Sequence, residues 1–246
     1  MTTNKTILSR AIRVIDAVSK SRDGLSFSEA SKVLDAPSPS TVNKILKELV
    51  QEGILQKSME KRYTLGRKVY FWGRVMAAQN TPVQVIRQRM KHLHEWLQIS
   101  VNLFTCVDKT MFCLESYLDP NAGYLYPVGK SLPLNLNVQG AVFFMPAEKL
   151  DDHDFLEKEA LKTEEPLSVA DLTKVVEYAR LNEIMDDFCL FYPGTRRFAV
   201  PIQENGRTVM TLGVGMSATR AQKDDHAEKI IAELKDIRLT VEDAME

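Results

Sequence analysis

The chain has 246 residues, of which 44% are apolar and 26% charged, as in soluble globular proteins of one or two domains. Its apolar runs are too short to span a bilayer, and its N-terminus lacks the basic and then apolar layout of a signal peptide. The three cysteines, an odd number, do not fit a disulfide scaffold and suit a reducing compartment. These features exclude membrane-spanning and disulfide-rich secreted proteins, and we expect a cytoplasmic protein.

Charge is distributed unevenly along the chain. Residues 1–78 contain 14 Lys and Arg against 7 Asp and Glu, which gives them a net charge of +7 and leaves −8 for the rest. A basic N-terminal third on an acidic body indicates a polyanionic partner for that third alone. Chance variation between short segments would give the same asymmetry, so charge by itself does not decide.

Two short helices are predicted first. In the first helix, apolar residues recur at helical spacing: Leu8, Ala11, Ile12, Ile15 and Val18. Asp23-Gly24 breaks this helix. Ser26 caps the second helix, with Glu29 at the capping-box position, and Asp35-Ala36-Pro37 ends it.

The third predicted helix has one apolar and one polar face. Ser38 suits its N-cap and Pro39 its first position, and Gly53 ends it. The apolar stripe consists of Val42, Ile45, Leu46, Leu49 and Val50. Two strand-like runs, 54–57 and 62–65, then enclose residues 58–61 as a small hairpin with basic residues at its tip and flanks. This order predicts a winged helix-turn-helix.

The chemistry of this unit suits double-stranded DNA. A helix fits the major groove, where Asn, Ser, Thr and Lys meet base edges, while cations on the wing neutralise phosphates. The alternative is that the polar face is merely solvated; order, spacing and charge together favour DNA. The candidate DNA-binding residues are Ser38, Ser40, Thr41, Asn43, Lys44, Lys47, Lys61 and Arg62.

The segment after the wing reads as a helix. Residues 67–79 contain no Pro and a single Gly, with Tyr70, Phe71 and Trp72 among their apolar residues. These aromatics either hold two subunits together or pack against the domains. Asn80-Thr81-Pro82 marks a boundary, which divides the chain into a winged helix-turn-helix domain (1–66), a linker helix (67–80) and a C-terminal domain (81–246).

The C-terminal domain alternates helices and strands. Helices are expected at 82–98 and 168–184 and again near the C-terminus, and 134–145 is expected to be a loop entering a helix. Strands are expected at 101–107, 111–117, 124–126, 198–203 and 208–216, the last two joined by an Asn-Gly hairpin turn at Asn205-Gly206. This pattern predicts an α+β domain around an antiparallel sheet.

Several of these segments, in order, resemble the IclR-type family of bacterial transcriptional regulators. In the N-terminal part they are residues 9–15, Ser28-Glu29-Ala30, Ser40-Thr41-Val42, Gly53-Ile54-Leu55 and Tyr63-Thr64-Leu65-Gly66. In the C-terminal part they are 128–134 with Gly140, Asp186-Asp187, Pro193-Gly194, 199–202 and Asn205-Gly206-Arg207. The resemblance covers nearly the whole chain. It implies a homodimer or homotetramer that binds pseudo-palindromic promoter DNA.

The resemblance also implies a GAF-like C-terminal domain that binds a small effector, often a carboxylic or aromatic acid. The pocket positions carried over are Tyr124, Leu132, Val138, Gln139, Asp187, Thr195 and Arg197. The chain departs from the family at Asn43-Lys44, at 135–142 and at Arg196-Arg197. A guanidinium in a pocket can clamp a carboxylate. Arg197 therefore either binds an anionic effector or pairs with Asp186 or Asp187 at the surface.

No catalytic or metal-binding pattern stands out. His92 and His94 are two apart on a predicted helix and point to different faces, and His153 and His226 are isolated. We therefore expect a ligand-responsive DNA-binding regulator without a cofactor or metal. The alternatives are an enzyme that uses the C-terminal pocket, with Asp187, Cys189 and His153 as its loose candidates, and a protein-interaction module.

Overall fold

The computed structural model describes residues 6–34, 38–79, 81–122, 126–163, 167–221 and 226–245. The chain forms two compact units, Met1–Asn80 and Thr81–Glu246. The predicted helix end at Asp35-Ala36-Pro37 and the candidate pocket residue Tyr124 lie outside the described residues.

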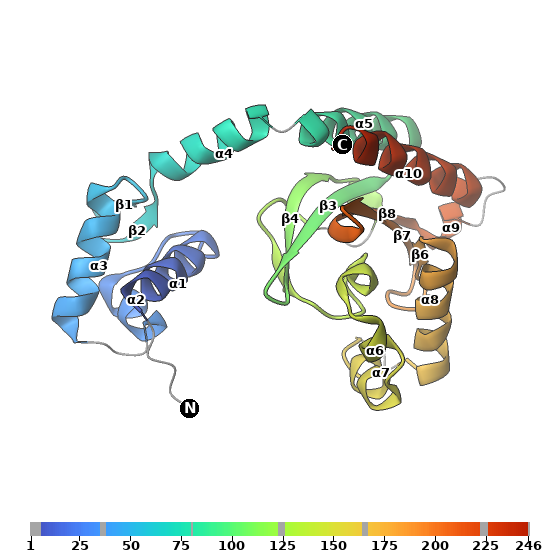
Figure 1. Ribbon diagram of the computed structural model, residues 1–246, viewed down its shortest axis with the longest axis horizontal. Coiled ribbons are helices and arrows are strands. Elements are labelled where there is room, and N and C mark those ends of the chain that lie inside the picture. The colour runs from blue at the N-terminus through green and yellow to red at the C-terminus, as the bar shows by residue number, and fades with distance from the viewer. Residues whose placement is uncertain are drawn as a thin grey trace. The chain divides into compact units, whose positions relative to one another are not determined.

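The first unit is a winged helix-turn-helix followed by a helix (Figure 1). Its elements are α1 (Ile7–Ser19), α2 (Phe27–Val33), α3 (Pro39–Gln51), β1 (Leu55–Lys57), β2 (Tyr63–Leu65) and α4 (Arg67–Gln79). β1 and β2 pair antiparallel and form the wing. The apolar faces of α1, α2 and α3 meet in one core with Leu55 and Tyr63 from the wing. The predicted order of elements is confirmed.

Local chemistry sets the helix starts of this unit. The Ser26 hydroxyl accepts from the Glu29 amide, and the Glu29 carboxylate accepts from the Ser26 amide, so both halves of the predicted capping box form. Ser38 caps α3 through the Thr41 amide, and Pro39 occupies the first turn. The caps of α2 and α3 are therefore where the sequence placed them.

The second unit is built on a six-stranded sheet in the order β5-β4-β3-β8-β7-β6, with every neighbouring pair antiparallel. The strands are β3 (Ser100–Val107), β4 (Thr110–Tyr117), β5 (Ser131–Pro133), β6 (Met185–Asp186), β7 (Thr195–Glu204) and β8 (Arg207–Ser217). Asn205 and Gly206 both have positive φ, as the tight β7–β8 hairpin requires. The predicted α+β domain is confirmed.

Helices cover the two faces of the sheet differently (Figure 1). α5 (Thr81–Leu97) and α10 (His226–Asp243) pack on the face that carries Leu103, Phe198 and Val214. On the opposite face, α7 (His153–Ala160) and α8 (Val169–Asn182) pack near Ala199, and a separate apolar cluster surrounds Phe104. The remaining short helices are η1 (Pro120–Ala122), η2 (Ala141–Phe144), α6 (Ala147–Leu150) and α9 (Ala218–Ala221).

The structure adds detail to the predictions for the stretch between β4 and β6, where residues 124 and 125 lie outside the described residues. The expected strand at 124–126 is not formed at Tyr126; β5 at Ser131–Pro133 pairs with β4 instead. The segment 134–145 is, as expected, a loop that enters a short helix, η2, but the helices that follow, α6 and α7, were not predicted. α6 has only 4 residues, and α7, with 8, is capped by Asp152 in a stretch rich in charged residues, where apolar periodicity is weak.

Among the described residues, no helix combines the length and apolar character that a membrane crossing needs.

Candidate nucleic-acid interface and effector site

The polar face of α3 is open to solvent. Ser40, Asn43, Lys44 and Lys47 are exposed, whereas Val42, Ile45, Leu46 and Leu49 on the other side are buried. Ser38 lies at the start of α3, where its hydroxyl is hydrogen-bonded to the Ser40 and Thr41 hydroxyls at 2.9 and 3.0 Å. Because the buried stripe fixes the rotation of α3, its predicted DNA-binding side chains project outward as one surface.

The two predicted wing cations have different surroundings. Lys61 is exposed at the tip, in a left-handed conformation with φ of 60°. Arg62 is half-buried, and its guanidinium donates to the Asp23 and Gly24 carbonyls and to the Glu29 carboxylate at 2.9, 2.7 and 3.1 Å. Lys61 is therefore available to a phosphate, while the Arg62 donors are engaged within the unit.

A groove lies between α3 and the wing. It has a volume of about 200 Å³ and is lined by Asn43, Leu46, Lys47, Val50, Gln51, Lys57 and Tyr63. The Lys57 ammonium lies 5.3 Å from the centre of the Tyr63 ring. The sequence places Lys57 on the flank of the hairpin, but only packing shows that it faces Lys47 across this groove.

In the second unit, a glycine on β8 makes room for a buried polar side chain on one face of the sheet. A Cβ at Gly213 would overlap the Gln139 side chain, and one at Gly215 would lie 3.8 Å from Cγ of Arg197. Both Gln139 and Arg197 are 1% exposed. Gly213 thus leaves the space that the buried Gln139 amide occupies, whereas a Cβ at Gly215 would be in ordinary van der Waals contact with Arg197.

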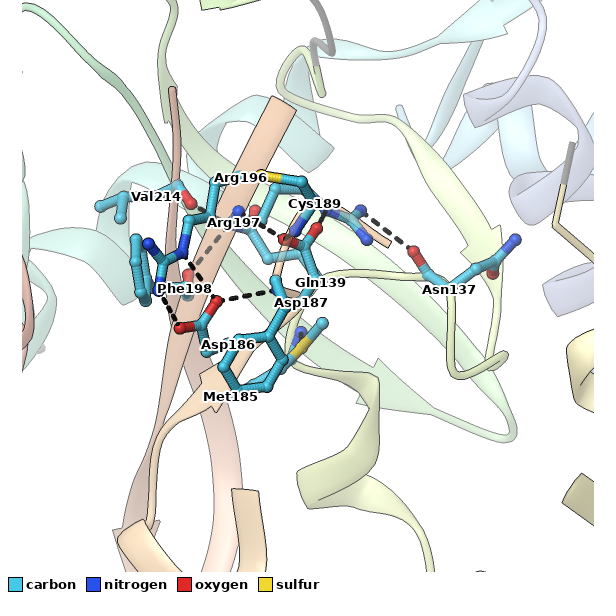
Figure 2. A network of polar contacts seen from close by, with 12 residues as sticks. Asn137, Gln139, Met185, Asp186, Asp187, Cys189, Arg196, Arg197, Phe198 and Val214 are labelled. Atoms are coloured by element: carbon cyan, nitrogen blue, oxygen red, sulfur yellow. Dashed lines mark hydrogen bonds and ion pairs between the residues drawn. The ribbon is translucent and has the colours of Figure 1, made fainter. Parts of the chain in front are cut away.

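Arg197 and Asp187 form a fully buried ion pair (Figure 2). The Asp187 carboxylate accepts from Nε of Arg197 at 2.6 Å and from the amides of Arg197 and Cys189 at 2.9 and 3.1 Å. Nη1 of Arg197 donates to the Tyr126 hydroxyl and the Asn137 carbonyl at 3.2 and 3.0 Å. Burial alone would lower the pKa of Arg197, but the charges of Tyr126 and Asp187 outweigh it and raise that pKa.

Arg196 pairs with the preceding carboxylate. Its Nε and Nη2 donate to the two oxygens of Asp186 at 3.1 and 2.6 Å. The hydrogen bond to Asp186 is the largest cause that raises the pKa of Arg196. Both arginines are therefore paired. Of the two alternatives left open for Arg197, the structure shows pairing with an aspartate, Asp187, but in the interior and not at the surface.

The other described pocket candidates are divided between two parts of the sheet. Leu132 and Val138 belong to the apolar cluster around Phe104, which includes the Arg197 partner Tyr126. Nε2 of Gln139 donates to the Phe198 and Val214 carbonyls at 3.0 and 2.6 Å, as Figure 2 shows. Thr195 is buried at the start of β7. Gln139, Asp187, Thr195 and Arg197 therefore lie at β6 to β8, whereas Leu132 is on β5 at the other edge of the sheet.

The sequence did not indicate two residues that hold this region. Tyr126 was expected in a strand, not beside Arg197. Glu159 of α7 is buried, accepts from the Leu136 amide at 2.8 Å and pairs with Lys162, which anchors the loop that supplies the Asn137 carbonyl. Their partners are distant in sequence, so no local pattern reveals them.

The loose catalytic candidates do not form a reactive set. The oxygens of Asp187 are occupied by Arg197 and backbone amides, so this carboxylate is not a free base. Burial raises the pKa of the Cys189 thiol, with Asp187 adding to the effect. His153 is exposed on α7 beside Asp154 and Glu157, and these residues are the one set in the described chain that could converge on a metal.

Comparisons with known proteins agree with the geometry. Residues 7–58 match the family model of the IclR helix-turn-helix domain. No curated protein is similar enough in sequence to match the chain. The chain superposes on an IclR transcriptional regulator from Alicyclobacillus acidocaldarius with a TM-score of 0.79 and 17% identity, over 98% of each chain.

Two further solved structures share this architecture. An IclR homolog from Microbacterium hydrocarbonoxydans, complexed with 4-hydroxybenzoate, gives a TM-score of 0.72 at 16% identity, over 98% of this chain and 99% of that one. The Thermotoga maritima IclR gives 0.63 at 18% identity, over 97% and 98%. Residues 7–58 thus match the helix-turn-helix domain of the IclR family. The resemblance is confirmed, and the whole chain has the fold of IclR-type regulators.

Proposed function

We propose that this protein is a transcriptional regulator that binds double-stranded promoter DNA through α3 and the wing and is controlled by a small molecule bound in its second unit. The observation that carries the proposal is the exposed polar and basic face of α3 in a domain that matches the IclR helix-turn-helix model. A fixed helix with outward Ser, Asn and Lys side chains suits the major groove.

The assembly and location follow from the same proposal. A symmetric dimer, or a tetramer of two dimers, would bind a pseudo-palindromic operator, with the half-site spacing set by protein geometry. Such a regulator works in the cytoplasm, and its domains are those expected from the sequence: 1–66 for DNA, 67–80 as linker and 81–246 for the effector.

The proposed effector is a small organic acid. Support comes from the fold shared with a homolog whose structure contains 4-hydroxybenzoate. In this chain the candidate site is the apolar cluster of Leu132 and Val138, next to the Tyr126 hydroxyl. Because Asp187 already neutralises Arg197, a carboxylate here would bind beside the ion pair and not to a free guanidinium.

DNA binding is tested by a mobility shift of the full chain on its own upstream intergenic DNA, across a salt series with competitor DNA. A specific shift that weakens steeply with salt supports the proposal. If no specific shift occurs at any salt concentration, with or without organic acids, the protein is not this kind of regulator.

The effector site is tested separately, by calorimetric titration with 4-hydroxybenzoate and related acids. Leu132→Trp fills the half-buried Leu132 position and should abolish heat release for the acid that binds the wild type. Leu161→Trp is the matched control, because Leu161 is 71% exposed after α7. Equal binding by both variants would place the effector elsewhere.

A further inference from the structure

The wing is attached to the turn between α1 and α2. Leu25 and Tyr63 exchange backbone hydrogen bonds at 2.9 and 2.7 Å, so Leu25 adds an isolated bridge to the wing strand β2. Gly24 has a φ of +73°, and a Cβ there would overlap the Tyr63 carbonyl oxygen. The backbone of the turn therefore lies directly against β2, and only glycine allows this approach.

The side chain of Arg62 adds further hydrogen bonds between the wing and the turn. Its guanidinium connects two carbonyls of the turn, those of Asp23 and Gly24, with the Glu29 carboxylate on α2. Hydrogen bonding from Ser26, followed by the charge of Arg62, lowers the pKa of Glu29. Arg62 thus joins the wing, the turn and the capping box of α2.

On the opposite side of the wing, a groove is lined by one cation of β1, Lys57, and one of α3, Lys47. Lys57 and Lys47 are exposed and line the groove between β1 and α3. Within the described residues neither ammonium forms an ion pair, and Lys57 lies over the Tyr63 ring. These side chains can turn toward an anion without breaking an existing salt bridge.

The geometry of DNA places a phosphate at this groove. When a helix lies in the major groove and a wing reaches the adjacent minor groove, the sugar-phosphate backbone that separates the two grooves passes between helix and wing. We propose that Lys47 and Lys57 bind this backbone phosphate, and that Arg62 is a positioning residue that holds the wing in place and does not itself contact DNA. The phosphate part of this inference rests on the proposed function; the positioning part does not.

The phosphate contact is tested by the salt dependence of DNA affinity in the full-length protein. Each phosphate contact contributes about 0.9 to the slope of log K against log salt. Lys57→Gln and Lys47→Gln should each lower the slope by about that amount and weaken binding about 5- to 10-fold near 0.1 M salt. Lys158→Gln, at an exposed position on α7 of the second unit, is the matched control and should change neither quantity.

Arg62→Lys separates positioning from contact because it keeps the charge but loses the planar, multiple-donor geometry. A phosphate contact would be largely restored by Lys. A positioning role would not: Arg62→Lys and Arg62→Gln should both weaken DNA binding with an unchanged salt slope. Near wild-type affinity for Arg62→Lys, together with a slope lowered by about 0.9 for Arg62→Gln, would overturn the proposal.

A second measurement needs no DNA. Hydrogen–deuterium exchange, followed by mass spectrometry, reports on the amides of Leu25 and Tyr63 that join the turn to the wing. Both Arg62 variants should exchange faster here, while Lys57→Gln and the wild type exchange alike. If the wild type binds no DNA, the proposed phosphate contact fails together with the proposed function, but hydrogen–deuterium exchange still tests the positioning role of Arg62. Unchanged exchange in both Arg62 variants would refute that positioning role.

Discussion

The exposed face of α3 with the wing tip, and the buried site of the second unit, use cations in opposite ways. On the first unit, Lys44, Lys47 and Lys61 project into solvent, with no ion pair to any residue that the structure describes. In the second unit, Arg197 is 1% exposed and its charge is neutralised by the equally buried Asp187. An exposed cation contributes little to folding and remains available to a partner, whereas a buried pair is committed to the fold. Residue type alone does not distinguish these roles.

The largest effect should follow from breaking the buried pair. Arg197→Ala leaves Asp187 buried without its counter-ion, and we expect a loss of about 3–5 kcal/mol of unfolding free energy. Denaturant unfolding of the full chain, followed by far-UV circular dichroism, measures this loss. Arg197→Met combined with Asp187→Asn should recover part of it; a single-variant loss below about 1 kcal/mol would contradict a structural role for the pair.

A smaller effect should come from the glycine that makes room for the buried amide. Gly213→Ala forces a methyl group into the Gln139 side chain, with an expected cost of about 1–3 kcal/mol in thermal or denaturant unfolding. Gly73→Ala is the control of opposite sign, because nothing lies within 4 Å of a Cβ there on α4. It should stabilise its helix by about 0.5–1 kcal/mol. Equal effects at both positions would mean that Gln139 repacks freely.

The exposed cations should give the smallest change in stability. Lys44→Gln is expected to alter the unfolding free energy by less than about 0.5 kcal/mol, since its side chain lies in solvent. The same variant should weaken specific DNA binding in the mobility shift. A marked loss of stability would show that the outward face of α3 helps to stabilise the domain. It would contradict the view that the exposed cations contribute little to folding.

Acid should affect the first unit through Glu29. Its pKa in the folded protein is lowered by hydrogen bonds from Ser26 and by the charge of Arg62, so the carboxylate stabilises the unit above its ordinary pKa near 4.5. That contribution is lost as the pH falls through the lowered folded value. Glu29→Gln should flatten this part of the stability profile between pH 5 and pH 2, measured by thermal unfolding. An unchanged profile would exclude Glu29 as its source.

Local chemistry explains which parts of the fold could be predicted. Ser26 with Glu29, Ser38 with Pro39, and Asn205-Gly206 act within a few residues, so each marks a helix start or a hairpin in the sequence itself. The apolar runs of β7 and β8 on either side of this turn carry similar information. The winged domain and the antiparallel sheet follow from such short-range signals.

Long-range contacts explain what could not be predicted. Arg62 finds its acceptors 33 to 39 residues earlier, and Arg197 reaches Tyr126 across 71 residues. The composition of the wing suggested that Arg62 would contact DNA, and pocket positions alone could not show that Arg197 would be neutralised by Asp187. Only the packed structure distinguishes a cation that is exposed and open to a binding partner from one whose donors are already engaged within the protein.

The consecutive pairs Arg196–Asp186 and Arg197–Asp187 also constrain how the sheet can assemble. Neighbouring residues on β7 point to opposite faces, so each arginine finds its own aspartate only in one alignment of β6 with β7. A slip of β6 by one residue would move Asp187 to the other face and leave the buried Arg197 guanidinium without its partner, because β7 is held by its long pairing with β8. The two ion pairs therefore fix the register of β6 against β7 at the edge of the sheet. The two-residue β6 has few backbone hydrogen bonds that could set this register by themselves.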